Sequence, residues 1–379
     1  MIGINYRRWI AVALIAVLGS IVDLSSIQAQ NSPDPIILNI QGDLWAWDGA
    51  DQPMTQLTDW GMNAEPILSP DGTRVAYTSV ASIFVDWLQT VEGGGGGFTP
   101  PENIWILDLP SRQTFRVADQ PADAVWNGPV EPGKYVLRTQ AVWSPDGQQL
   151  AWIEFLAALI PITNDTRTDT AQIIVYDLVS QTTRLIDSFP VSNRLARSGL
   201  FTLNWGEAGI VLNHLINDQA VTALEMRIYD LSGSVITEIH SERLTPDQWI
   251  QYQEQAYLFD QRGDFDQWLN WHTGKAEAMP GSPEMYSLTA PDGASLFASG
   301  DTWSLALPDQ PPVDLGEDIR PLGISRDGQS AIYGRWELNP ATGYFAYTVL
   351  VQSQDQLIEI GRYQNVQPVW GPTGWRVRS

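Results

Sequence analysis

The feature that most constrains this chain is a short phrase that recurs along it. Ser-Pro-Asp-Gly stands at residues 69–72 and 144–147, and each copy lies between two apolar runs. Pro presets φ at the second turn position, Asp accepts local backbone hydrogen bonds and Gly tolerates positive φ, so the phrase predicts a tight turn between two strands. Weaker or eroded copies stand at residues 204–209, 290–293, 325–328 and 369–374. A recurring hairpin predicts a repeat architecture.

A second motif follows the hairpins. Ile-Leu-Asp-Leu (106–109), Val-Tyr-Asp-Leu (175–178) and Ile-Tyr-Asp-Leu (228–231) each precede turn residues and another short β-rich run. Four antiparallel strands per unit are typical of a β-propeller blade. On these motifs the chain resembles the TolB-type, WD-repeat-like β-propellers over almost its whole mature length. The resemblance implies a propeller fold and recognition of a partner protein, although we expect no counterpart of the extra N-terminal domain of TolB.

The blade number follows from the spacing of the units. Six hairpin turns lie near residues 70, 145, 206, 291, 326 and 372, and an eroded unit is expected within residues 255–275. The sequence therefore predicts an all-β, seven-bladed propeller of four-stranded antiparallel blades over residues 30–379; six blades is the alternative if that segment is an insertion. Residues 36–61 are expected to be the last two strands of a blade whose hairpin lies at residues 367–377. Sharing one blade between the chain ends would close the ring and leave no open sheet edge.

The N-terminus has the pattern of a signal peptide over residues 1–29. Arg7 and Arg8 precede an apolar run over residues 9–22, and Ala29 precedes the expected cleavage point. An uncleaved anchor is the alternative, but the run is shorter than the roughly 20 residues that a spanning helix needs. We therefore expect a secreted or periplasmic monomer with no membrane span after cleavage. The chain has no cysteine, which excludes a lipid-anchored lipoprotein.

Charge narrows the choice of partners. The chain has 44 acidic and 21 basic residues, for a formal net charge of −23. An acidic surface repels phosphate backbones and anionic lipids, so we expect no nucleic acid partner and no attraction to anionic membranes.

The segments between the second and third strands of the units vary most in length: residues 79–102, 156–171, 215–224 and 336–343. They are expected to emerge on one face of the ring, where loops on a rigid scaffold often bind ligands. The alternative is that the loops merely tolerate insertion, because closing a longer loop costs little. The predicted binding residues are Trp87, Phe98, Asn164, Asp165, Arg167 and Trp336. Aromatic side chains stack on sugars or anchor peptides, so the expected partner is a protein or a glycan.

Residues that recur in register are expected to be structural. Asp71 and Asp146 belong to the repeated turn, which assigns them to turn chemistry. Trp143, Trp205 and Trp370 stand just before a turn in their units and are expected to pack between blades.

A search for catalytic motifs finds none. The histidines (His214, His240 and His272) lack metal-ligand spacing, and no Gly-x-Ser-x-Gly elbow occurs. We therefore predict no metal, no cofactor and no catalytic residue, and the favoured hypothesis is an exported non-catalytic propeller that binds a protein or other ligand through its loop-rich face. The alternative is a carbohydrate-active hydrolase or lyase with paired carboxylates at the channel. Its candidate residues outside the turns are Asp86, Glu154, Asp165 and Glu337, and a buried carboxyl of raised pKa beside another would favour it.

Overall fold

The computed structural model describes residues 36–47, 54–85, 101–125, 134–156, 168–192, 201–218, 221–241, 249–252, 255–259, 265–270, 275–277, 287–289, 295–299, 302–307, 309–324, 330–340, 342–353, 356–364 and 366–368. Within these residues the regular structure is all β apart from a helical turn at residues 82–85. None of the helical structure in this part of the chain has the length and apolar character needed to cross a membrane. The predicted signal peptide lies outside the described residues.

The described strands form seven antiparallel sheets, which we number in chain order. Sheet 1 joins β29 (Val366–Pro368), β1 (Ile36–Ile40), β2 (Asp43–Trp47) and β3 (Thr55–Gln56). Sheet 2 contains β4 (Asn63–Leu68), β5 (Arg74–Val80), β6 (Glu102–Asp108) and β7 (Gln113–Ala118). In sheet 3, β8 (Val136–Arg138) and β9 (Val142–Trp143) both pair with β10 (Gln149–Leu156), which is followed by β11 (Thr168–Asp177) and β12 (Thr182–Ser192).

The remaining sheets each hold four consecutive strands. Sheet 4 contains β13 (Phe201–Gly206), β14 (Gly209–Asp218), β15 (Val221–Tyr229) and β16 (Val235–Ser241). Sheet 5 contains β17 (Trp249–Tyr252), β18 (Gln255–Phe259), β19 (Phe265–Asn270) and β20 (Lys275–Glu277). Sheet 6 contains β21 (Ser287–Thr289), β22 (Ser295–Ser299), β23 (Thr302–Ala306) and β24 (Val313–Gly316). Sheet 7 contains β25 (Ile319–Ile324), β26 (Ser330–Leu338), β27 (Phe345–Ser353) and β28 (Leu357–Tyr363).

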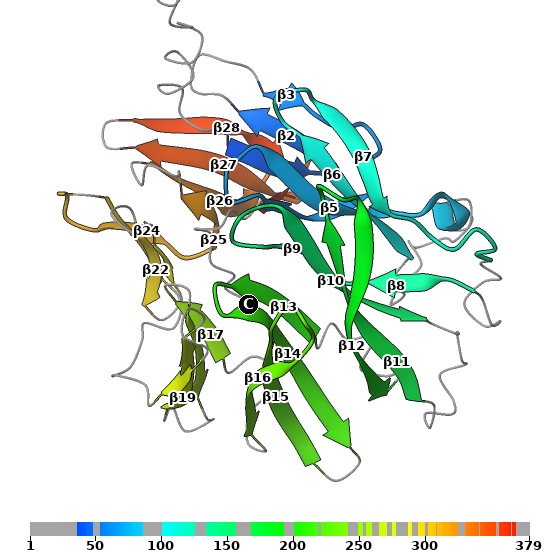
Figure 1. Cartoon of the computed structure of the whole chain (residues 1–379). Coiled ribbons are helices and arrows are strands. Elements are labelled where there is room, and N and C mark those ends of the chain that lie inside the picture. Colours follow the sequence, from blue (N-terminus) through cyan, green and yellow to red (C-terminus); the bar gives the residue numbers. More distant parts are fainter. Residues whose placement is uncertain are drawn as a thin grey trace, which may run out of the picture.

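The sheets follow one another around the molecule in chain order (Figure 1). The path runs from β2 and β3 at the top through β7, β11 and β15 to β19, β22 and β27. The predicted all-β class is confirmed, and six of the seven described sheets have the predicted four antiparallel strands, whereas sheet 3 has five. The unit expected within residues 255–275 forms sheet 5, whose first strand begins earlier, at Trp249.

The two complete Ser-Pro-Asp-Gly phrases form the turns that the sequence predicts. Ser69 Oγ donates to Asp71 Oδ1 at 2.5 Å, and the Thr73 N–H donates to the same oxygen at 3.0 Å. In the second copy the corresponding distances to Asp146 Oδ1 are 2.6 Å from Ser144 Oγ and 3.0 Å from the Gln148 N–H. Asp71 and Asp146 are therefore turn residues, as predicted.

The core lies in layers between neighbouring sheets. Trp143 is buried against sheet 2, and its Nε1 donates to the Ile67 carbonyl oxygen at 3.1 Å. Trp205 packs against the cluster between sheets 3 and 4. These contacts confirm the predicted packing role of both tryptophans, whereas Trp370 lies outside the described residues.

The prediction for the chain ends is wrong in one respect. β1 pairs with β29, with Leu38 opposite Pro368, so Ile36–Ile40 is the second strand of sheet 1 and not the third. The residues after β1 form a two-residue hairpin, because Gln41 (φ 55°) and Gly42 (φ 87°) both adopt positive φ. The N-terminal part of the chain therefore supplies three strands of this sheet, and described residues of the C-terminal part supply one.

One predicted loop is largely strand, and a second begins within a strand. β14 and β15 leave only two residues between them, so residues 215–224 are mostly a continuous hairpin. Residues 336–343 also begin within a strand, because β26 extends to Leu338 and pairs with β27. Cross-strand aromatic partners, such as Trp336 opposite Tyr347, favour this continuation of the ladder.

Candidate active site

Charged and polar residues gather where sheet 2 meets sheet 3. Glu102 begins β6, on the same face as Ile104 and Ile106, which pack against Trp152 of sheet 3. From sheet 3, Arg138 ends β8 and stands opposite Glu154 of β10. We call Glu65, Glu102, Arg138, Trp152 and Glu154 the Glu102 cluster.

Arg138 connects the two sheets. Its side chain is only 4% exposed, and its Nε donates to Glu154 Oε1 at 2.7 Å. Nη1 donates to the carbonyl oxygen of Glu102, and Nη2 donates to that of Asp119, each at 2.8 Å. One planar guanidinium therefore fixes the main chain of Glu102 relative to the carboxylate of Glu154.

Glu154 is oriented by two donors. Its Oε1 accepts from Arg138 and also from Nε1 of the fully buried Trp152, at 2.9 Å. The Glu154 side chain is nevertheless 21% exposed, so solvent reaches it. Charge-assisted hydrogen bonds of this length hold a carboxylate in one orientation.

Glu102 is held in its protonated form at neutral pH. Burial raises the pKa of its carboxyl to about 8, the neighbouring charge of Glu65 acts in the same direction, and a hydrogen bond with Thr78 opposes them. A carboxyl that keeps its proton near pH 7 can donate it to a leaving group. Glu102 therefore has the property required of a general acid.

Two glutamines fix the backbone around this cluster. Gln120 Nε2 donates to the carbonyl oxygens of Glu102 and Val136, each at 3.0 Å, and its Oε1 accepts from the Val136 N–H at 2.9 Å. Gln140 Nε2 donates to the carbonyl oxygen of Glu65 at 3.2 Å. Glu65 has a positive φ of 48° beside a register shift in β4, so its position depends on such support.

A second polar cluster lies on sheet 4, on the face turned toward sheet 3. We call His214, Glu225, Arg227 and Glu238 the His214 cluster. Arg227 donates to Glu225 Oε1 at 2.6 Å and to Glu238 Oε1 at 3.1 Å, and His214 Nδ1 lies 3.8 Å from Glu225 Oε2. Burial lowers the pKa of His214 to about 4, and the charge of Arg227 adds to this effect. Burial raises the pKa of Glu225, and its hydrogen bond with Glu238 acts in the same direction.

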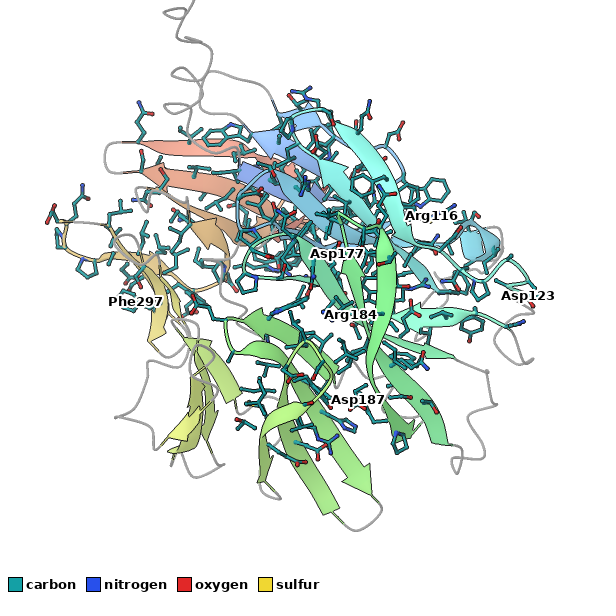
Figure 2. All side chains as sticks on the ribbon, in the orientation of Figure 1. Arg116, Asp123, Asp177, Arg184, Asp187 and Phe297 are labelled. Carbon is teal, nitrogen blue, oxygen red and sulfur yellow. The ribbon has the colours of Figure 1, made fainter. Side chains whose placement is uncertain are left out.

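Contacts with β12 tie sheet 4 to sheet 3. The Tyr229 hydroxyl donates to Asp187 Oδ2 at 2.8 Å, and Arg184 Nη1 donates to the Leu231 carbonyl oxygen at 2.6 Å. Figure 2 shows Arg184 and Asp187 along β12, beside sheet 4. These bonds indicate that the His214 cluster belongs to the packing of the two sheets.

The structure places three of the sequence-predicted residues. Glu154 belongs to the Glu102 cluster, whereas Trp336 and Glu337 lie on β26 of sheet 7. Glu337 accepts from Thr348 Oγ1 and lies 3.8 Å from Arg362 Nη2, so it does not pair with Glu154. The other predicted residues lie outside the described part of the chain: Asp86, Trp87, Phe98, Asn164, Asp165 and Arg167.

The sequence did not indicate Glu65, Glu102 or Arg138 as site residues. Glu102 follows Pro100 and Pro101 and begins β6, with Asn103 between it and the apolar residues, and Arg138 ends the apolar run of β8. A charged residue at the end of an otherwise apolar strand is the signal that was available. Among the described residues, no group of three or more His, Asp or Glu side chains could hold a metal ion.

Comparison with known proteins gives fold likenesses only. No family model matches the chain, and no curated protein matches it. Its structure is similar to an acylaminoacyl peptidase from Pyrococcus horikoshii (13% identity, TM-score 0.47), covering 85% of this chain and 48% of that one. It is also similar to an oligogalacturonate lyase from Vibrio parahaemolyticus (11% identity, TM-score 0.45), with 80% of this chain and 88% of that one covered. A third similar structure is the β-propeller domain of the Trilobed protease from Pyrococcus furiosus (14% identity, TM-score 0.41), with 80% of this chain and 84% of that one covered. The chain spans about half the length of the acylaminoacyl peptidases.

These similarities correct the main functional prediction. The similar structures include peptidases and lyases, so the prediction of a non-catalytic binding protein is contradicted. At 9–14% identity, no reaction, substrate or partner is carried over from them. The reaction has to be argued from the residues of this chain.

Proposed function

We propose that this chain is a carbohydrate-active hydrolase or lyase whose acid and base lie in the Glu102 cluster. The observation that carries the proposal is the guanidinium of Arg138, which fixes the main chain of Glu102 and the carboxylate of Glu154 across one interface. Cleavage of a glycosidic bond uses two carboxyl groups in different protonation states, and this interface supplies different surroundings for each.

The two glutamates receive separate roles. Glu102 donates its proton to the glycosidic oxygen as the bond to the leaving sugar breaks. Glu154 acts through Oε2, because Oε1 accepts from both Arg138 and Trp152. In a hydrolase this oxygen activates the attacking water; in a lyase it takes the proton beside a uronate carboxylate, and a carbon–carbon double bond forms as the leaving oxygen departs.

We also propose that the seven sheets are the blades of a closed propeller and that the protein is exported as a monomer. The pairing of β1 with β29 supports closure, because it joins the two ends of the described chain in one sheet. Removal of residues 366–379 deletes β29, so the melting temperature should fall; an unchanged value would contradict closure. N-terminal sequencing of the exported protein should begin at Gln30.

The catalytic proposal is tested by activity against a panel of neutral and uronate polysaccharides. Residues 30–379 are incubated with each glycan, and new reducing ends and unsaturated products are measured separately, since only a lyase yields the latter. Glu102→Gln and Glu154→Gln should each lower the rate by about 10²-fold or more. Glu359→Gln is the matched control, because Glu359 is an exposed acid paired with Arg362 on sheet 7. Full activity in Glu102→Gln, or no activity of the unaltered chain on any glycan, would contradict the proposal.

A further inference from the structure

Sheet 7 carries an exposed aromatic surface where β26 ends and β27 begins. We call Trp336, Leu338, Tyr344, Phe345 and Tyr347 the aromatic platform. The Trp336 ring stacks on that of Phe345 at 5.5 Å with an interplanar angle of 9°, and it lies 4.6 Å from the ring of Tyr347. Trp336 opposes Tyr347 and Leu338 opposes Phe345, so these four side chains share one face of the sheet.

The platform is exposed because the neighbouring sheet is short. Lower on the same face, Ile332 and Val349 pack against Leu38 and Ile40 of sheet 1. β1 and β26 are each the second strand of their sheet. β1 ends at Ile40, which packs at the level of Ile332, whereas β26 continues for six residues beyond Ile332. Trp336 is consequently 37% exposed and Phe345 is 54% exposed. Adjacent exposed aromatic side chains often mark a binding surface.

A positive side chain lies beside the platform, and the segment that carries the platform has no net charge. The Arg320 guanidinium carbon lies 5.6 Å from the centre of the Tyr347 ring. Residues 319–363 contain four arginines and four acidic residues, so this segment is neutral within a chain of net charge −23. This segment therefore adds no net repulsion of an anionic polymer, and Arg320 places a positive group at the edge of the platform.

We propose that the aromatic platform is a stacking subsite for a pyranose ring of a uronate-containing polysaccharide, with Arg320 pairing with the uronate carboxylate. Flat aromatic rings suit the apolar face of a sugar, and guanidinium suits a carboxylate. A protein partner fits this surface less well, because a stable protein interface buries roughly 800 Å² per partner and a few partly exposed side chains offer far less area. The inference rests on the proposed function in taking the substrate to be a glycan, and it names the class of that glycan.

Calorimetric titration of residues 30–379 tests the subsite with two probes of equal length, an oligogalacturonate and a neutral cello-oligosaccharide. All titrations use the Glu102→Gln background and are kept short enough that product analysis finds the probe intact afterwards. The oligogalacturonate should bind more tightly than the neutral probe. Trp336→Ala should weaken its binding about tenfold, which corresponds to the loss of one stacking contact. Arg320→Gln should remove the preference for the anionic probe, and Trp336→Phe should keep most of the affinity.

Leu357→Ala provides the matched control, because Leu357 is an exposed apolar residue at the opposite end of β28 and lies outside the platform. The affinity of Leu357→Ala for the oligogalacturonate should be unchanged. Equal binding of both probes, or unaltered affinity in Trp336→Ala, would overturn the inference, as would a dimer that Trp336→Ala dissociates. If Trp336→Ala unfolds, Arg320→Gln decides, because it leaves the aromatic packing intact.

The same variants separate this inference from the catalytic proposal. Weakened oligogalacturonate binding in Trp336→Ala together with undiminished cleavage by the Glu102→Gln chain supports the subsite and refutes the Glu102 assignment. Lost cleavage in Glu102→Gln together with unaltered binding in Trp336→Ala supports the Glu102 assignment and refutes the subsite.

Discussion

The two polar clusters contain similar residues but use their arginines differently. In the His214 cluster, Arg227 donates to the carboxylates of both Glu225 and Glu238, so its charge faces two acids. In the Glu102 cluster, Arg138 donates to two carbonyl oxygens and to the carboxylate of Glu154. The Glu102 carboxyl receives none of these three bonds, and its pKa rises to about 8. The direction of the N–H groups, and not the mere presence of an arginine, separates a cluster suited to proton transfer from one that holds two sheets together.

The largest expected effect is on stability, from loss of Arg138. Arg138→Gln removes a buried cation bonded to both sheets and should lower the free energy of unfolding by about 3–5 kcal/mol. Arg227→Gln removes a more exposed guanidinium and should cost about 1–3 kcal/mol. Urea denaturation at pH 7 measures both. Equal losses of stability in the two variants would show that the two arginines contribute alike.

The next effect is on the alkaline side of the stability profile. The pKa of Glu102 is about 8 in the folded chain and near 4.5 when unfolded, so the folded form binds the proton more tightly. The stability that the Glu102 carboxyl contributes is fully present at acid pH and is lost as pH rises through about 8. Allowing for partial exposure, the unaltered chain should lose on the order of 2–3 kcal/mol through this group between about pH 5 and 8. Glu102→Gln should flatten that decline, and an unchanged slope in urea titrations across this range would count against it.

The His214 cluster should control the acid side instead. His214 has a pKa of about 4 when folded and near 6.5 when unfolded, so the unfolded chain binds the proton more tightly. Stability through this group is present above about pH 6.5 and is lost as pH falls toward 4, by about 2 kcal/mol. His214→Gln should remove this acid loss while leaving the alkaline limb intact. If the variant alters the alkaline limb instead, the two clusters are not independent.

The smallest effect concerns a residue outside both clusters. Asp146→Ala removes the acceptor for Ser144 Oγ and the Gln148 N–H, and it should lower stability by about 1 kcal/mol without changing activity. Asp123→Ala is the control, because Asp123 is an exposed partner of Lys134. Thermal unfolding compares them. Equal melting temperatures for the two variants would show that the turn contributes no more than an exposed ion pair.

The parts of the fold that depend on local chemistry could be predicted from sequence. The turns at Asp71 and Asp146 are encoded within a few adjacent residues, and Trp143 lies next to such a turn. The place of β1 in its sheet could not be predicted, because it depends on a partner more than 300 residues away, at Pro368. The strand character of Trp336 depends on a nearer partner, Tyr347, across a turn that the spacing of the repeats did not place.

The candidate site was predictable only in part. Glu154 stands out because it is an acid within an apolar strand. The raised pKa of Glu102 comes from burial by sheet 3 and from the charge of Glu65, which lies 37 positions earlier in the chain. Spacing along the sequence carries no information about such neighbours, because strand pairing and sheet packing bring them together.

The most direct test is the titration of the Glu102 carboxyl itself. Carbon NMR of glutamate-labelled protein follows each carboxyl with pH, and the resonance absent from Glu102→Gln identifies Glu102. If Glu102 is the general acid, this resonance titrates near pH 8. A Glu102 carboxyl that ionises below about pH 6 would contradict this role, because it would have no proton to donate at neutral pH.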